Sequence, residues 1–194
     1  MPSHHQKKLE KKKKQRLAAQ KAARKELAPM SAAALMRVAA ELPVEAAYMT
    51  SGWRTKEPKP VTVVLTRLVP GQGILVACAM VDRTCLGVKD GFAKLVLSRE
   101  ELHGMFDQIE TAYAEDDVED VPLLEAQSVV YHAIDYARSL GFEPHKDFPE
   151  LLFGPRPETL LDTPLAKPKA PIYIAGPNDD QARILAKLEA ARPR

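Results

Sequence analysis

Cysteine, aromatic residues and long hydrophobic runs are scarce in this sequence. Two cysteines among 194 residues are too few for a disulfide framework, and they do not form the C-x-x-C spacing of a paired metal site. The longest unbroken apolar run covers eight residues, 74–81, whereas a membrane-spanning helix needs roughly 20. No apolar block of the secretory type follows the basic N-terminus before Ala28. We therefore expect a cytoplasmic protein with reduced thiols and without a membrane partner.

Motifs of the common catalytic and cofactor sites are absent as well. The sequence contains no nucleophile elbow, no phosphate-binding glycine loop and no pair of histidines at metal-ligand spacing. We therefore expect no cofactor and no bound metal. The single tryptophan, Trp53, lies in a polar stretch without a second aromatic residue. This setting favours a half-buried lid over the core, and a platform for base stacking is the alternative.

Charge is distributed unevenly along the chain. The formal net charge is +2, but residues 1–28 alone carry +8, because they hold ten basic residues against Glu10 and Glu26. The remaining 166 residues therefore carry 2 − 8 = −6. Such a separation bears on binding partners more than on the fold. The ten basic residues are Lys7, Lys8, Lys11, Lys12, Lys13, Lys14, Arg16, Lys21, Arg24 and Lys25.

The basic segment has the composition of a helix. Residues 6–27 are almost all strong helix formers, without glycine or proline, and their few leucines do not form a wide apolar stripe. We therefore expect residues 1–28 to be a mobile helical arm that does not pack on its own domain. The favoured interpretation is binding along RNA phosphates. A solvated tail is one alternative, and an anionic membrane surface is another, which the lack of Trp and Phe disfavours.

The apolar run 74–81 is the centre of the predicted fold. Both of its alternating sets of side chains are apolar, as in a strand that is covered on both faces. Turn residues at 70–73 predict an antiparallel hairpin with a strand over 61–69. The glycine-bounded segment 87–91 is expected to be a loop. The other predicted elements are helices over 31–41, 98–113, 122–140 and up to about residue 190, and short strands over 92–97 and 172–175.

These elements predict an α+β domain, a small mainly antiparallel sheet with helices packed on it, preceded by the basic N-terminal helix. The core covers residues 30–153. A proline-rich strap over 154–171 follows, and residues 172–194 form a C-terminal strand and helix packed on the core. Asn178 or Asp179 is the expected cap of the last helix.

Residues 114–120 are strongly acidic. Five carboxylates fall within seven positions, and such a density is able to hold a hard cation. The stretch lacks the spaced ligands and the glycine of a calcium loop. A solvated acidic turn, with negative charge at the start of the next helix, is the favoured interpretation.

Candidate site residues follow the apolar strand and recur in a later turn. Asp82, Cys85 and Lys89 come directly after the strand, and His145 and Asp147 lie in a proline-bearing turn. If these segments meet, a thiol beside lysine or histidine is a nucleophile with His145 as its base. Alternatively, Asp82 together with Asp147 or Asp179 holds a divalent ion. The structural interpretation assigns a buried apolar role to Cys85 and a carboxylate partner to Lys89.

Three phrases carry a resemblance to a known family. They are D-x-x-C-L-G-V-K at Asp82–Lys89, L-G-F-x-P-H-x-D-F at Leu140–Phe148 and G-P-x-D-D at Gly176–Asp180. With them the chain resembles an uncharacterised bacterial family, a domain of unknown function. The resemblance covers roughly residues 40–190 and leaves out the basic arm. It implies that the three segments meet in space, and it implies no particular reaction.

The sequence thus favours a non-enzymatic cytoplasmic binding protein whose arm contacts RNA or another polyanion, on a ribonucleoprotein. One alternative is a hydrolase or nuclease that uses Asp82, Cys85, Lys89 and His145. A second alternative is a protein-interaction module with a merely solubilising tail. The sequence leaves the oligomeric state open.

Overall fold

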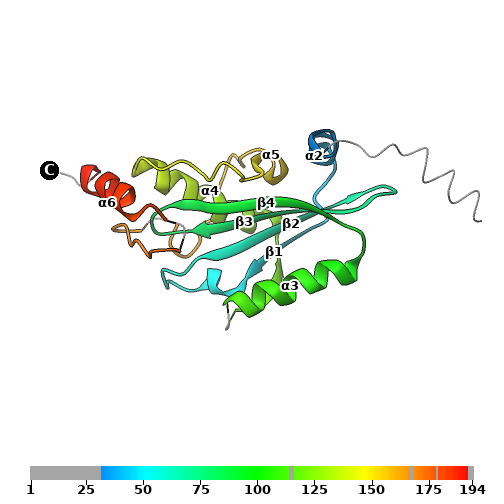
Figure 1. Cartoon of the computed structure of the whole chain (residues 1–194), viewed down its shortest axis with the longest axis horizontal. Coiled ribbons are helices and arrows are strands. Elements are labelled where there is room, and N and C mark those ends of the chain that lie inside the picture. Colours follow the sequence, from blue (N-terminus) through cyan, green and yellow to red (C-terminus); the bar gives the residue numbers. More distant parts are fainter. Residues whose placement is uncertain (1–31, 114–115, 167, 178, 192–194) are drawn as a thin grey trace, which may run out of the picture. The chain divides into compact units, whose positions relative to one another are not determined.

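The computed structural model describes residues 32–113, 116–166, 168–177 and 179–191 (Figure 1). The predicted basic arm, residues 1–28, lies outside the described residues. The chain divides into two compact units, residues 1–37 and 38–194. Helix α2 (Ala32–Glu41), predicted from the sequence, crosses the boundary between them. We refer to the larger unit, residues 38–194, as the globular unit.

This unit contains one five-stranded sheet in which every strand pair is antiparallel, which confirms the predicted α+β class. The strand order is β4-β3-β2-β1-β5. The apolar run therefore lies in an interior strand, β3, as predicted, and β2 is the central strand. The strands are β1 (Ala46–Thr50), β2 (Val61–Val69), β3 (Gly73–Asp82), β4 (Gly87–Val96) and β5 (Val118–Val121).

The β2–β3 hairpin forms at its predicted position. Its register runs from Val61 opposite Val81 to Val69 opposite Gly73. The N–H of Gln72 donates to the carbonyl oxygen of Val69 at 3.0 Å, which closes the turn. Gly73 has a φ of 135°, and a Cβ there would lie 2.3 Å from the carbonyl oxygen of Val96, so this turn requires glycine.

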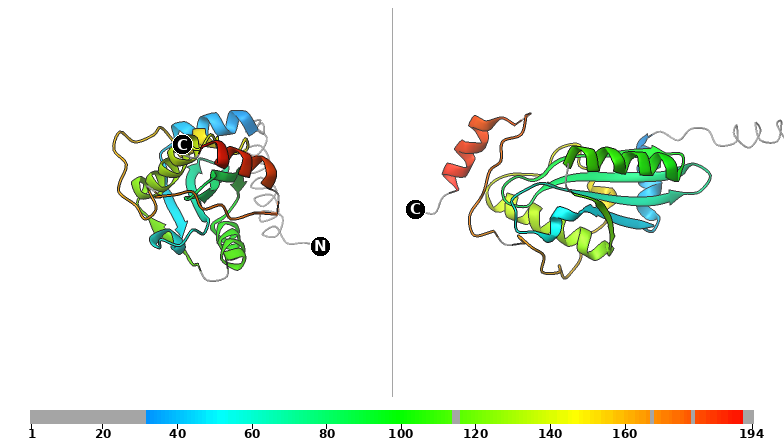
Figure 2. Two further views of the ribbon diagram at one scale, coloured as in Figure 1. Left: turned by 90° about the vertical axis from the view of Figure 1, so that its left-hand side faces the viewer. Right: turned by 90° about the horizontal axis from the view of Figure 1, so that it is seen from below.

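Helices cover both faces of the sheet (Figures 1 and 2). On one face lies α3 (Arg99–Tyr113), whose Leu102 and Met105 pack on Val76 and Cys78 of β3. The other face carries α4 (Leu123–Ser139) and the short α5 (Glu150–Phe153). Burial of both sheet faces explains why the β3 sequence is apolar at consecutive positions.

The start of α3 confirms Ser98 as the cap but forms only half of the predicted capping box. The hydroxyl of Ser98 accepts from the N–H of Glu101 at 3.2 Å. The Glu101 carboxylate in turn accepts from the N–H of Leu97 at 3.0 Å. The first bond satisfies a donor that the first helical turn leaves without a partner. The second bond goes to the residue before the cap, whereas a full capping box bonds the N–H of the cap residue itself.

Two predicted connections are strands instead. Residues 87–91, expected to be a loop, begin β4, because the chain already reverses over residues 83–86. Part of the acidic stretch forms β5, which pairs with β1. Asp and Glu are rare in strands, so the sequence favoured a turn. The tertiary pairing with β1 overrides that local preference.

The sheet ladder contains one irregularity at Lys89. Met80 pairs with Asp90 and Val81 pairs with Val88, so Lys89 has no counterpart on β3. This two-against-one arrangement is a β-bulge. Gly87, just before it, has a φ of 69°, and a Cβ there would lie 2.8 Å from the Cβ of Ala137. Glycine thus permits the close approach of α4 to this end of the sheet.

The C-terminal part differs from the prediction in two details. No strand forms over residues 172–175. Instead Ile172 makes two bonds with Thr84: its N–H donates to the Thr84 carbonyl at 3.1 Å, and its carbonyl accepts from the Thr84 hydroxyl at 3.0 Å. The cap of α6 (Gln181–Ala190) is Asp180, which accepts from the N–H of Arg183 at 3.1 Å, rather than Asn178 or Asp179.

Candidate functional site

The structure brings three sequence segments together beside the β3–β4 turn. The N–H of His145 donates to the carbonyl oxygen of Val88 at 2.9 Å, which holds residues 140–148 against β4. The ammonium of Lys89 donates to the Asp179 carboxylate at 2.9 Å, which holds residues 176–180 to the same strand. The segments that carry the sequence phrases are therefore neighbours in space.

Asp82 stabilises the turn that leads into this site. Its side chain oxygen Oδ1 accepts from the N–H groups of Thr84 and Cys85 at 2.9 and 3.0 Å, and from the Thr84 hydroxyl at 3.1 Å. The residue is only 7% exposed. A carboxylate that accepts several local donors in this way replaces backbone partners in a tight turn. Asp82 therefore has a clear structural role.

Cys85 lies in the core behind the turn. It is 0% exposed and belongs to a cluster with Ala137 and Phe142. Burial and the neighbouring Asp82 raise the pKa of the Cys85 thiol to about 12, although Lys89 acts in the opposite direction. The reactive form of cysteine is the thiolate. At neutral pH this thiol is both protonated and inaccessible, which matches the apolar interpretation.

Lys89 and Asp179 form a partly buried ion pair. Asp179 Oδ2 also accepts from the Tyr173 hydroxyl at 3.0 Å and from the Gly176 N–H at 2.8 Å. Partial burial acts to raise the pKa of Asp179, but the bonds from Lys89, Gly176 and Tyr173 lower it overall. The pair is 13% exposed on each side chain. It fixes the turn before α6 to the edge of the sheet.

His145 lies among exposed carboxylates rather than beside the thiol. Its Nδ1 is 3.6 Å from Asp90 Oδ1 and 3.8 Å from Asp147 Oδ2. Within the part of the chain that the structure describes, no hydrogen bond or ion pair joins His145 to Cys85, so these two residues do not form a thiol–histidine pair. The oxygens Asp82 Oδ1 and Asp179 Oδ2 already accept hydrogen bonds that stabilise the fold.

Metal ligands do not cluster elsewhere either. Over the described ranges, no group of three or more His, Cys, Asp or Glu side chains is arranged to hold an ion. The acidic stretch is engaged in pairs instead: Asp116 Oδ1 accepts from the Lys59 ammonium at 2.8 Å, and Glu119 accepts from the indole N–H of Trp53 at 2.8 Å.

Arg54 covers the Trp53 ring, with its guanidinium carbon 4.6 Å from the ring centre. Trp53 is 7% exposed, which excludes it as an open stacking platform.

Sequence reasoning missed Arg83, the most connected side chain at the turn. It is 3% exposed, and burial lowers its pKa to about 10 although Asp116 and Asp82 act in the opposite direction. The guanidinium joins the β3–β4 turn to the loop after β1 and to the proline-rich strap. Its acceptors are the carbonyl oxygens of Gly52, Trp53, Thr55, Glu57 and Pro164, at 2.8 to 3.4 Å.

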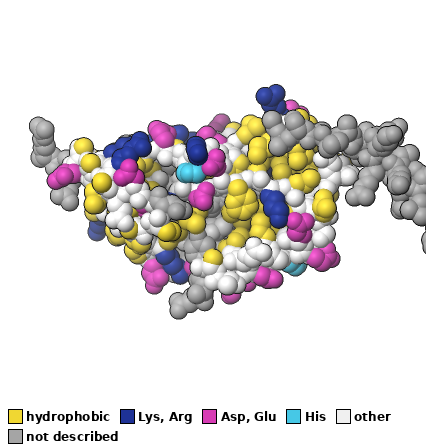
Figure 3. All heavy atoms as spheres, viewed as in Figure 1, with side chains coloured by type: hydrophobic (Ala, Val, Ile, Leu, Met, Phe, Trp, Pro, Cys, Tyr) yellow, Lys and Arg dark blue, Asp and Glu magenta, His cyan; other side chains and the backbone are white. Residues whose placement is uncertain are grey.

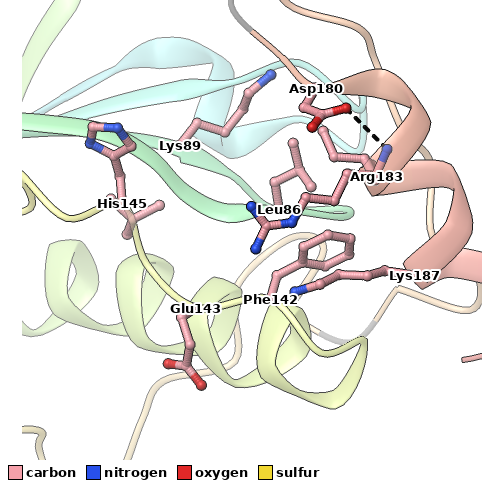
Figure 4. A pocket seen from close by; sticks show the side chains of 10 residues that line it. Leu86, Lys89, Phe142, Glu143, His145, Asp180, Arg183 and Lys187 are labelled. Carbon is pink, nitrogen blue, oxygen red and sulfur yellow. Dashed lines mark hydrogen bonds between the residues drawn. The ribbon is translucent and has the colours of Figure 1, made fainter.

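A pocket of about 420 Å³ lies where the three segments meet (Figure 4). Lys89 and His145, two of the predicted site residues, line it, whereas Asp82, Cys85 and Asp147 do not. Its apolar side chains are Leu86, Val88, Phe142 and Ile184, and its remaining charged ones are Glu143, Asp180, Arg183 and Lys187. The three sequence motifs pointed to the segments that meet here. Nothing in the sequence of α6, apart from its helical pattern, indicated that this helix lines the pocket.

No helix among the described residues combines the length and apolar character needed to cross a membrane. In comparisons with protein-family models, curated proteins and solved structures, no match to the chain was found. The resemblance carried by the three sequence phrases therefore stays a prediction.

Proposed function

We propose that this chain is a non-enzymatic binding protein whose basic N-terminal segment contacts RNA, in the cytoplasm and on a ribonucleoprotein. The observation that carries the proposal is the charge distribution: residues 1–28 carry +8 and the remaining 166 carry −6. Each phosphate that a lysine or arginine neutralises releases condensed counterions, which favours binding irrespective of base sequence. The acidic remainder repels phosphates, so the basic segment is the expected contact.

The distribution of charge on the globular unit indirectly supports the basic segment as the RNA contact. On the face seen in Figure 3, acidic and basic side chains are interspersed and do not form one large cationic patch. Several basic side chains of residues 38–194 have carboxylate partners, as in the pairs Lys94–Glu101 and Arg156–Asp135. Such pairs leave little uncompensated positive charge for a phosphate backbone.

The hydrolase or nuclease alternative receives no comparable support. Cys85 is buried and protonated, and Asp82 is bound to the turn. Lys89 is paired with Asp179. Because each of these groups is already engaged in the fold, we do not propose a reaction for the cluster.

The test compares two full-length variants with equal charge changes. The first is Lys11→Gln, Lys12→Gln, Lys13→Gln and Lys14→Gln in one chain. Its control is Lys56→Gln, Lys94→Gln, Lys146→Gln and Lys169→Gln, which removes four exposed lysines of the globular unit. Affinity for a single-stranded RNA oligonucleotide is measured by fluorescence anisotropy at several salt concentrations.

Only the first variant is expected to reduce the slope of log K against log salt, by about 3, since each lost contact to single-stranded RNA contributes about 0.7. Wild type and control are expected to retain the same slope. Equal slopes in all three proteins, or no RNA binding by wild type at low salt, would show that the basic segment is not an RNA contact.

A further inference from the structure

We propose that the pocket between the β3–β4 turn, residues 142–145 and α6 binds a small organic anion, a carboxylate attached to an apolar body. This inference does not depend on the RNA proposal, because it rests on side chains of the globular unit alone. The volume of about 420 Å³ falls within the range of roughly 300–1,000 Å³ that small-molecule sites occupy.

The pocket offers an apolar wall to such a ligand. Leu86 and Phe142 belong to the same buried cluster as Cys85, and Ile184 of α6 packs against that cluster. Val88 completes the wall from β4. A bare inorganic ion gains nothing from these surfaces, whereas a ligand with an aliphatic or aromatic body gains free energy in proportion to the apolar area that it buries.

Arg183 supplies the group that recognises charge. Figure 4 shows its side chain extending from α6 over Leu86 into the pocket. Among the described residues, its guanidinium has no hydrogen-bond or ion-pair partner. A guanidinium is able to donate two parallel bonds to one carboxylate. An uncompensated guanidinium above an apolar wall is therefore complementary to a carboxylate with an apolar body.

The other charges at the pocket are largely occupied. Glu143 accepts from Arg138 at 3.0 Å, and Figure 4 shows its carboxylate directed away from Arg183. Asp180 accepts from the backbone N–H of Arg183 as the cap of α6. Lys187 donates to the Gly141 carbonyl at 2.7 Å and lies 5.1 Å from the Phe142 ring centre. Lys89 is paired with Asp179. Arg183 is thus the pocket's arginine or lysine for which the described residues offer no partner, and Lys187 adds positive potential beside it.

The experiment uses two probes with the same apolar body. Phenylbutyrate carries a carboxylate, and its amide, phenylbutanamide, has no charge. Each is titrated into the isotope-labelled full-length chain while backbone amide chemical shifts are followed. We expect phenylbutyrate to shift the amides of Val88, Phe142 and Ile184 with saturation, and to bind about tenfold more tightly than the amide.

The variant Arg183→Gln is expected to lose this tenfold preference while still binding the neutral amide. The matched control is Lys146→Gln, which removes an exposed lysine next to His145 that does not line the pocket; it should behave as wild type. Shifts confined to residues 1–28 would overturn the proposal, because the basic segment would then be the anion site. The absence of saturable shifts at the pocket, or equal affinities for acid and amide in wild type, would overturn it as well.

Discussion

Replacing Arg83 with methionine should strongly destabilise the globular unit. The guanidinium is almost fully buried and donates to five carbonyl oxygens, four in residues 52–57 and one at Pro164. Methionine fills much of the same volume, so the cost arises from carbonyl groups that lose a charged donor inside the fold. The bonds to Gly52 and Trp53 are fully buried, and each buried acceptor left without a donor costs about 1–3 kcal/mol, so the loss should be about 2–6 kcal/mol. That is a large fraction of the roughly 5–15 kcal/mol by which domains are stable.

Urea unfolding followed by circular dichroism measures the change. The midpoint should fall without a change in m, because the surface exposed on unfolding stays the same. Arg83→Lys should lose about 1–3 kcal/mol, since one ammonium keeps the charge but cannot reach acceptors arranged around a planar fork. The control is Arg54→Met, which removes an exposed arginine that pairs with Glu119 and should cost less than about 1 kcal/mol. A loss below about 1 kcal/mol for Arg83→Met would refute this account.

Two further predictions concern the thiols and the ion pair. Burial raises the pKa of both Cys78 and Cys85 to about 12. A thiol reagent at neutral pH should therefore modify the folded chain at least about a thousandfold more slowly than the chain in denaturant. Fast modification of either thiol in the folded chain would contradict this burial. Because the pKa of Asp179 is lowered, its stabilising effect is present above the unfolded value near 3.8 and is lost as the pH falls through the folded value. Asp179→Asn should therefore lower the free energy of unfolding, measured in urea at pH 7, by about 1–3 kcal/mol. The difference in free energy of unfolding between this variant and wild type should shrink below about pH 4. A difference that stays constant down to pH 3 would argue against the pairing with Lys89.

The sequence predicted the elements whose signals are local. The β2–β3 hairpin has turn residues between two apolar runs, and α3 has Ser98 as its cap. The long helix before Gly141 has a clear helical period and appears as α4. In each of these segments the local preference and the tertiary packing agree, so a pattern of a few residues is sufficient.

Elements fixed by distant partners were missed. Strand β5 is acidic and becomes a strand only through its pairing with β1. Arg83 appeared to be one polar residue in a turn, whereas its acceptors lie about 30 residues earlier and about 80 residues later in the chain. The phrases around residues 82–89, 140–148 and 176–180 did locate the pocket. They left open whether Cys85 serves a reactive site or the core, and they did not reveal that Asp82 stabilises the turn, because burial is not visible in a motif.

The bulge in β4 has a consequence for the two halves of that strand. Cross-strand neighbours share a face, so Val88 lies on the face of Val81, whereas Val96 lies on the opposite face with Ile74. Both are even-numbered, and a regular strand would place them on the same side. Lys89 is the extra residue of the bulge, and it makes even-numbered side chains before and after it point to opposite faces of the sheet. Its own side chain forms the ion pair with Asp179. Deleting Lys89 would leave both halves in register while detaching the turn before α6, whereas Lys89→Met would detach the turn and keep the bulge. Comparing these two chains separates the geometry of the sheet edge from the attachment of the C-terminal helix.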